Sequence, residues 1–149
     1  MRVVLCSMQY APDHTGLAPF TTGVAEHLSR CGHSVEVIAA MPHYPQWRFP
    51  DEYGRRLWVD EQRNGIRVRR WRVPLPARRS TVGRIIYDSS IALFTLLTLP
   101  RMLRADVLIA VSPPIQLPLL TSLVARATGA RQVTYRWHLA ARVPTERDH

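Results

Sequence analysis

The chain of 149 residues contains no lysine, so all 20 of its basic side chains are arginine. Genomic codon bias is the simple explanation for this absence. Against 11 acidic residues the arginines give a formal net charge of +9, which favours anionic partners such as nucleotide phosphates or anionic lipid head groups. Nucleic acid is not an expected partner, because the sequence lacks the interleaved aromatic and basic residues of RNA-binding modules and the spacing of a zinc finger or helix-turn-helix.

Cysteine and long apolar runs are scarce as well. Cys6 and Cys31 have neither metal-ligand spacing nor a disulfide pattern, and are interpreted as buried thiols in a reducing compartment. The opening apolar run is too short for a secretory signal. The longest apolar stretch covers only residues 91–99, whereas a bilayer span needs roughly 20 residues. We therefore expect a cytoplasmic protein.

Several catalytic motifs are absent. There is no G-x-G-x-x-G, which disfavours a dinucleotide-binding oxidoreductase domain, and no G-x-x-x-x-G-K-[ST] phosphate loop. Ser112 lacks the G-x-S-x-G elbow of a serine hydrolase. No D-x-D pair and no acid–histidine cluster suggests a metal, so we expect no metal and no cofactor.

Along the sequence, apolar runs typical of strands alternate with amphipathic segments typical of helices. Nearly continuous apolar runs predict buried parallel strands over 2–8, 34–40 and 106–112, and a less apolar strand over 131–137. Asn64-Gly65 predicts a hairpin between 57–62 and 66–73. In its second strand the apolar residues change from even positions to odd positions, and a bulge near Arg69-Arg70 would account for the change.

The helices are expected from Pro19 to Cys31-Gly32, from an N-cap at Ser80 to about Leu99, and over 115–128. Residues 74–79 are predicted to be a linker, and Pro100 stops or kinks the second helix. The pattern predicts an α/β fold: a Rossmann-like open parallel sheet with flanking helices and a β-hairpin insertion.

Ligands of such sheets bind at the carboxyl ends of the strands, where the loops 9–19, 41–56 and 112–115 are expected to converge. In "YAPDHTGLAPFTTGVAEHL", Gly16 and the following helix N-terminus form either a tight turn or a cradle for a phosphate. His14 and His43 either meet a ligand hydroxyl or phosphate or are simply solvated. Tyr44 and Trp47 either stack on a sugar ring or pack under their loop.

The motifs TG-x-x-P[FY]TT, GH-x-V-x-V and PHYPQW make residues 1 to about 130 resemble the N-terminal half of family 4 glycosyltransferases. Within that family the chain is similar to the bacterial polysaccharide branch. The resemblance implies the N-terminal half of a GT-B fold, in which a second domain binds most of the nucleotide-sugar donor. It also implies a retaining, metal-independent transfer to a lipid-linked glycan acceptor on the cytoplasmic face of the membrane.

The resemblance also implies residue roles. Thr15 and Gly16 match the loop beside the donor diphosphate, where many relatives have Gly-Gly. The predicted acceptor-binding residues are His14, His43, Tyr44, Trp47 and Ser112. Relatives often carry Gln-Asp or His-Asp after the last strand, where this chain has Trp137-His138, so His43 and His138 are the catalytic candidates.

By the same resemblance, residues 1–137 form the acceptor-side domain, residues 138–149 form an irregular tail, and the donor-binding domain is absent. The chain is then a fragment, a truncated product or half of a split enzyme with a separately encoded C-terminal domain, and little transfer is expected from it alone. The alternatives are a non-catalytic module that binds acceptor or membrane, and a remnant without function.

A basic cluster lies at the start of the helix expected from Ser80. Arg78, Arg79 and Arg84 stand beside Ile85 and Ile86, a combination that can dock on anionic lipid. The alternative is a core helix with a solvated arginine edge. The sequence thus predicts Arg78, Arg79 and Arg84 as the residues that would contact a membrane.

Overall fold

The computed structural model describes residues 1–76 and 80–136. These residues form the following elements in chain order: β1 (Arg2–Cys6), α1 (Ala18–Arg30), β2 (Ser34–Ala40), a 3-10 turn (Asp51–Tyr53), β3 (Trp58–Arg63), β4 (Ile66–Trp71), α2 (Thr81–Leu97), α3 (Leu99–Met102), β5 (Val107–Ser112), α4 (Gln116–Thr128) and β6 (Arg131–Arg136).

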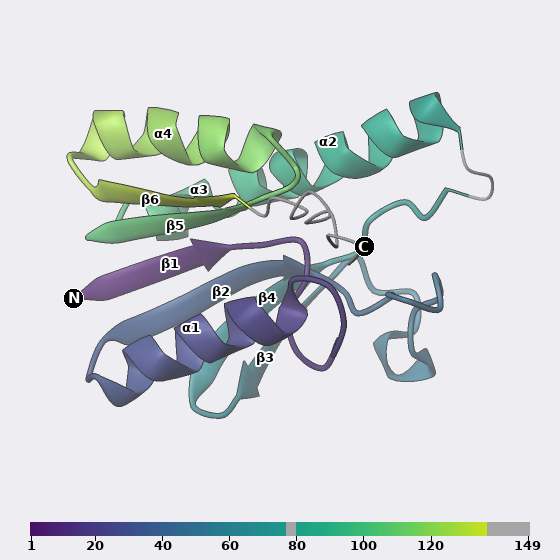
Figure 1. Cartoon of the computed structure of the whole chain (residues 1–149), viewed down its shortest axis with the longest axis horizontal. Coiled ribbons are helices and arrows are strands. Elements are labelled where there is room, and N and C mark those ends of the chain that lie inside the picture. Colours follow the sequence, from purple (N-terminus) through teal and green to yellow (C-terminus); the bar gives the residue numbers. More distant parts are fainter. Residues whose placement is uncertain (77–79, 137–149) are drawn as a thin grey trace, which may run out of the picture.

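The strands form one six-stranded sheet in the order β3-β4-β2-β1-β5-β6 (Figure 1). Every neighbouring pair is parallel except β3 and β4, which form the antiparallel hairpin. The central strands β1 and β2 are buried on both faces, which explains why their sequences are continuously apolar rather than alternating. The hairpin therefore adds one edge to an otherwise parallel sheet.

Helices cover both faces of the sheet, and each face has its own core. On one face Tyr87 and Ile91 of α2, Met102 of α3 and Leu117 of α4 pack on the strands. On the opposite face Ala25 of α1 and the preceding Leu17 do the same. Figure 1 shows α4 and α1 on opposite sides of the strands. This arrangement confirms the predicted fold class, a Rossmann-like open sheet with flanking helices and a hairpin insertion.

The bulge predicted near Arg69-Arg70 is wrong. β3 and β4 pair in one unbroken register, from Trp58 opposite Trp71 to Arg63 opposite Ile66. The two phases of apolar residues instead serve the two covered faces, because Val68 packs on the α1 side and Trp71 on the α2 side. Arg70 then takes an inward position on the α1 side and is fully buried.

The helices begin and end at the capping, glycine and proline residues of the sequence. The Ser80 hydroxyl accepts a hydrogen bond from the Gly83 N–H at 3.0 Å and caps α2, as predicted. Gly129 ends α4 in the left-handed conformation, with φ of 76°. Pro100 lies in the first turn of the short α3, so the chain breaks between α2 and α3 at Thr98. None of the helices among the described residues is long and apolar enough to cross a membrane.

Candidate functional site

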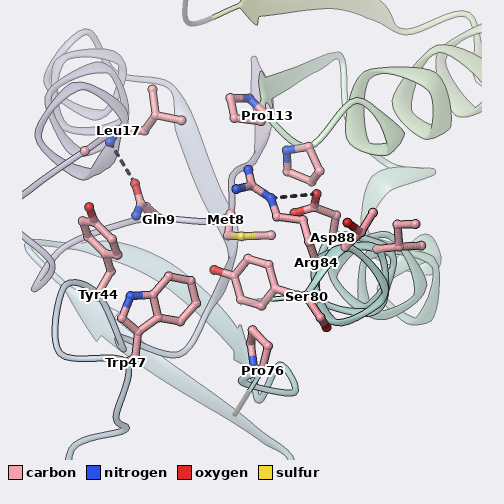
Figure 2. Close-up of a pocket in the computed structure, with 15 residues that line it drawn as sticks. Met8, Gln9, Leu17, Tyr44, Trp47, Pro76, Ser80, Arg84, Asp88 and Pro113 are labelled. Carbon is pink, nitrogen blue, oxygen red and sulfur yellow. Dashed lines mark hydrogen bonds and ion pairs between the residues drawn. The ribbon is translucent and has the colours of Figure 1, made fainter. Parts of the chain in front are cut away.

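A cavity of about 780 Å³ opens at the carboxyl edge of the sheet (Figure 2). Three loops and one helix build it: the β1–α1 loop, the loop after β2, the prolines after β5, and the first two turns of α2. The lining residues are Met8, Gln9, Gly16, Leu17, Tyr44, Trp47, Pro76, Ser80, Thr81, Arg84, Ile85, Tyr87, Asp88, Pro113 and Pro114. The three loops expected to converge at this edge therefore do so.

The β1–α1 loop is organised by Gln9 and Gly16. The Gln9 side-chain oxygen Oε1 accepts a hydrogen bond from the Leu17 N–H at 2.9 Å, just before α1 begins. Gly16 has φ of +61°, and a Cβ placed on it would lie 2.5 Å from the same Oε1 atom. The backbone angle favours glycine, and a Cβ here would displace the Gln9 side chain from its hydrogen bond to the Leu17 N–H. Gly16 thus helps to determine the conformation of the loop.

The start of α1 has few N–H groups left to offer a ligand. Leu17 N–H donates to Gln9, Ala18 N–H donates to the Thr15 carbonyl oxygen at 3.3 Å, and Pro19 has no N–H. The Thr15 hydroxyl, by contrast, is buried and finds no partner within the described part of the chain. A buried hydroxyl without a partner is unusual in a folded protein. Thr15 does not line the cavity, so this loop offers a ligand the dipole of α1 rather than a full ring of amides.

His43 lies beneath the cavity rather than in its wall. Its Nδ1 atom is 2.7 Å from the Met41 carbonyl oxygen and its Nε2 atom is 2.6 Å from the Tyr87 hydroxyl. A carbonyl can only accept, so Nδ1 carries the proton and the Tyr87 O–H donates to Nε2. Burial lowers the pKa of His43, which keeps the ring neutral. His43 thus joins the loop after β2 to helix α2.

Tyr44 and Trp47 form an aromatic wall on one side of the cavity, as Figure 2 shows. Their ring centroids are 6.1 Å apart in an edge-on arrangement, and the Trp47 ring is also 5.7 Å from that of Tyr87. Trp47 is 46% exposed and has φ of 53°, a conformation that non-glycine residues rarely adopt. The loop after β2 therefore presents an indole that is only partly covered by protein.

Arg84 and Asp88 lie opposite the aromatic wall (Figure 2). They are one turn apart on α2, and Arg84 Nε is 3.5 Å from Asp88 Oδ2. The Arg84 side chain is 72% exposed, so its remaining donors point to solvent or to whatever fills the cavity. The cavity thus combines an aromatic platform with a cation and a carboxylate.

Arg70 anchors the β1–α1 loop from below. Its guanidinium donates to Glu61 Oε1 at 2.6 Å, to the Ala40 carbonyl oxygen at 3.3 Å and to the Ala11 carbonyl oxygen. These bonds tie the ends of β2 and β3 to the loop that carries Gly16. In the same loop, burial raises the pKa of Asp13 to about 6, although the positive charges of Arg70 and His14 lower it.

Of the remaining predicted site residues that the structure describes, His14, Thr15 and Ser112 do not line the cavity. His14 is exposed, with its ring 3.4 Å from the Pro12 carbonyl oxygen. Ser112 is buried at the end of β5, and the two prolines that follow it line the cavity instead. Arg78, Arg79 and His138 lie outside the described residues. Of the described candidates, Gly16, Tyr44, Trp47 and Arg84 meet in one cavity.

Residues not expected from the sequence complete the site. Gln9 directly follows the buried run that contains β1, and a polar residue at that place is a usable signal. Asp88 lies one helical turn after Arg84, a spacing typical of an ion pair on one helix face. Across residues 1–76 and 80–136, no group of three or more metal-ligating side chains comes together.

Comparison with known proteins gives two sequence matches. A family profile described as "Glycosyl transferase 4-like domain" matches residues 15–148. The chain is also 32% identical over 139 residues to the colanic acid biosynthesis glycosyl transferase WcaI of Escherichia coli (strain K12). That alignment covers 91% of this chain and 33% of the relative, so the chain spans about a third of that protein's length.

Solved structures with the same fold are more distant in sequence. The catalytic domain of starch synthase IV from Arabidopsis thaliana, solved with ADP and acarbose, superposes with a TM-score of 0.54 at 22% identity. The match covers 90% of this chain and 33% of that one. A C-terminal domain of the PF1911 hydrogenase from Pyrococcus furiosus gives a TM-score of 0.56 at 13% identity, covering 90% of each chain. At these identities the likeness concerns the fold alone.

Proposed function

The chain belongs to the glycosyl transferase 4-like family, and on that premise we propose that it is the acceptor-side domain of a glycosyltransferase. The acceptor is a lipid-linked glycan, as in the assembly of a cell-surface polysaccharide, and the donor is a nucleotide-sugar. The reaction is metal-independent and retains the configuration of the transferred sugar. It takes place at the cytoplasmic face of the membrane.

The observation that carries the proposal is the composition of the cavity wall. Tyr44 and Trp47 offer aromatic faces on which a sugar ring can stack, while Asp88 offers acceptor oxygens for its hydroxyls. Arg84 and the dipole of α1 favour the negative charge of a phosphate. Aromatic, carboxylate and cationic groups around one cavity suit a phosphorylated glycan better than an apolar ligand.

Transfer breaks the bond between the donor sugar and its diphosphate and forms a new bond to an acceptor hydroxyl, whose proton passes to the leaving diphosphate. In this proposal the leaving diphosphate gains negative charge beside Gly16, where the dipole of α1 stabilises it. His43 does not act as the proton acceptor in this proposal, because both of its ring nitrogens are engaged below the cavity. Its role is to position Tyr87 and the loop after β2.

Acceptor binding is tested by titrating the chain with a short-chain polyprenyl diphosphate that carries one hexose, followed by calorimetry. Trp47→Ala removes the stacking surface and is expected to weaken binding by about two- to tenfold, since aromatic contacts of this kind contribute about 0.5–1.5 kcal/mol. Trp58→Ala is the matched control, because Trp58 is an exposed tryptophan on β3 that does not line the cavity. Equal affinity of both variants and the parent chain would contradict the proposed acceptor site.

Transfer itself is tested with UDP-glucose, GDP-mannose and ADP-glucose as donors and the same acceptor. The chain alone is expected to give little or no product, because the chain spans about a third of its relative. Addition of the remaining two thirds of the relative, supplied as a separate polypeptide, is expected to restore transfer. Acceptor binding without transfer in that mixture would identify a non-catalytic binding module instead.

A further inference from the structure

Gln9 has a second polar group besides the oxygen that organises the β1–α1 loop. Its Oε1 atom accepts the Leu17 N–H at 2.9 Å. A backbone N–H can only donate, so the atom that faces it is the oxygen, and the Nε2 amino group is directed away from that N–H. Within residues 1–76 and 80–136, Nε2 has no hydrogen-bond partner, and Gln9 lines the cavity. The cavity wall therefore includes an amino group whose two N–H bonds are not used by the described part of the chain.

Contacts to its backbone and its side chain hold Gln9 in one position. The Ser7 hydroxyl donates to the Gln9 carbonyl oxygen at 2.9 Å and accepts the Gln9 N–H at 3.3 Å, and the Thr21 hydroxyl lies 2.8 Å from the same carbonyl oxygen. Both Ser7 and Thr21 are fully buried. The hydrogen bond from the Leu17 N–H also polarises the carboxamide, which makes Nε2 a stronger donor. A donor fixed in this way loses little conformational freedom when it binds a ligand.

The surroundings of this amino group favour a sugar as its ligand. Figure 2 shows Gln9 on the same side of the cavity as the aromatic wall of Tyr44 and Trp47, whereas Arg84 lies on the other side. Stacking on an aromatic face holds the plane of a sugar ring but leaves the ring free to rotate within that plane. A fixed donor beside the wall removes this freedom, in the way that a few well-placed polar groups orient a ligand in an otherwise apolar site.

We propose that Gln9 is a specificity-determining residue, whose Nε2 amino group donates a hydrogen bond to one hydroxyl oxygen of the acceptor sugar that stacks on Tyr44 and Trp47. The inference rests on the proposed function, which assigns the acceptor sugar to this wall. Because the donor is held in place, only a hydroxyl at one position of the ring meets it. A sugar that lacks this hydroxyl, or carries it on the opposite face of the ring, leaves the amino group without a partner and binds more weakly.

The inference is tested by calorimetry with the short-chain polyprenyl diphosphate that carries one hexose, and with a set of deoxy forms that each lack one ring hydroxyl. Gln9→Met replaces the carboxamide by a side chain of similar length without N–H groups, and is expected to bind the hexose probe about two- to tenfold more weakly. In the parent chain one deoxy form is expected to show a loss of the same size, and in Gln9→Met removal of that hydroxyl should have no further effect. Gln62→Met is the matched control, because Gln62 is an exposed glutamine on β3 that does not line the cavity.

Two further measurements separate recognition by Gln9 from its role in the loop. Gly16→Ala keeps Gln9 but places a Cβ 2.5 Å from its Oε1 atom, so the carboxamide is displaced and the same dependence on one hydroxyl is expected to disappear. In the parent chain, the NMR signals of the Gln9 side-chain NH2 group are expected to shift when the hexose probe binds, and to shift much less with a polyprenyl diphosphate that carries no hexose. Circular dichroism checks that each variant is folded.

Two results would overturn the inference. One is a Gln9→Met variant that keeps the parent chain's dependence on every hydroxyl, whether or not its overall affinity falls. The other is an equal shift of the NH2 signals with the hexose-free probe, which would show that the amino group binds the diphosphate. The proposed acceptor site stands in both cases if Trp47→Ala still weakens binding. A parent chain that does not bind the hexose probe contradicts the proposed function as well, so the two failures are distinguishable.

Discussion

At the scale of the residue, Arg70 shows how a charged side chain can be part of a protein core. Its side chain is fully buried, and its guanidinium donates hydrogen bonds to the Glu61 carboxylate and to the carbonyl groups of Ala40 and Ala11. The guanidinium also lies 5.8 Å from the centroid of the Tyr10 ring. The Coulomb attraction and these hydrogen bonds offset the desolvation of the charge. The same contacts hold the β1–α1 loop over the end of the sheet, so the residue serves the site as well as the fold.

Arg70→Leu is expected to lower the free energy of unfolding by about 3–5 kcal/mol, because it leaves the Glu61 carboxylate and two carbonyl groups without their donor. Urea unfolding followed by circular dichroism measures the change. Arg67→Leu is the control, since Arg67 is an exposed arginine on the same strand. Addition of Glu61→Gln to Arg70→Leu is expected to recover part of the loss. Equal effects of the two arginine substitutions would contradict the buried pairing.

For Asp13, in contrast, nearby positive charges do not offset the cost of removing the carboxylate from water. Its pKa is raised by burial to about 6, from an ordinary value of 3.8. The folded state therefore binds the proton more tightly than the unfolded state, and stability contributed by the protonated acid is lost as the pH rises through about 6. A charged Asp13 at neutral pH makes the folded state less stable than a neutral side chain would.

Asp13→Asn is accordingly expected to stabilise the protein above about pH 6 and to make little difference below about pH 4, where the native acid is protonated in both states. Urea unfolding over this pH range measures the difference. Asp51→Asn serves as the comparison, because the Asp51 side chain is 93% exposed. A stabilisation by Asp13→Asn that does not vary with pH would show that burial of the charge is not its cause.

At the scale of the element, α2 begins where its cap dictates. The Ser80 hydroxyl accepts the Gly83 N–H, and the backbone of Ser80 is extended, as an N-cap requires. No acidic residue in the first turn assists it. The cap therefore determines the position of the first turn of α2, which contributes Thr81 and Arg84 to the cavity and leaves Val82 exposed.

Ser80→Ala is expected to cost about 1 kcal/mol of stability, the usual value for the loss of a side-chain N-cap. Ser80→Asp, which can accept the same hydrogen bond and interacts well with the helix dipole, is expected to restore it. Thermal unfolding compares these variants with Ser89→Ala, a change at an exposed serine in the middle of α2. If Ser80→Ala and Ser89→Ala unfold at the same temperature, the hydroxyl does not stabilise the helix.

At the scale of the whole molecule, the order β3-β4-β2-β1-β5-β6 decides what meets at the site. β1 is paired on both sides by parallel strands, so the loops after β1, β2 and β5 leave the same edge. Right-handed crossovers place α1 on one face of the sheet and the later helices on the other. The cavity lies between these two layers of helices because the chain changes direction at β1.

This topology predicts an order of stability across the sheet. Backbone amides of β1 and β2 are expected to exchange with deuterium most slowly, because both strands are paired on two sides and buried. Amides of β6, a largely exposed edge strand, are expected to exchange faster by an order of magnitude or more. Mass spectrometry of peptic peptides measures both. Equal protection of β6 and β1 would contradict the description of β6 as an uncovered edge.

The sequence by itself determined the elements, their parallel pairing and the edge of the sheet at which the loops converge. Apolar runs, the Asn64-Gly65 turn and the Ser80 cap act over a few residues, so they can be interpreted locally. The sequence also placed Gly16, Tyr44 and Trp47 near one another, since each stands in a loop at that edge. Arg84 was predicted only as a membrane contact, and the structure adds it to the cavity.

Only the tertiary structure decided which side chains reach the cavity. His43 stands in the predicted loop but turns under it to meet Tyr87, a residue 44 positions away. Arg70 is buried because Glu61 and Ala11 come to it from other elements, and no local pattern contains those partners. Ile85, Ile86 and Leu93 of α2 likewise have the apolar character of core residues, but they are exposed because the sheet covers only one side of the helix. The direction of a side chain depends on contacts distant in sequence, which periodicity does not encode.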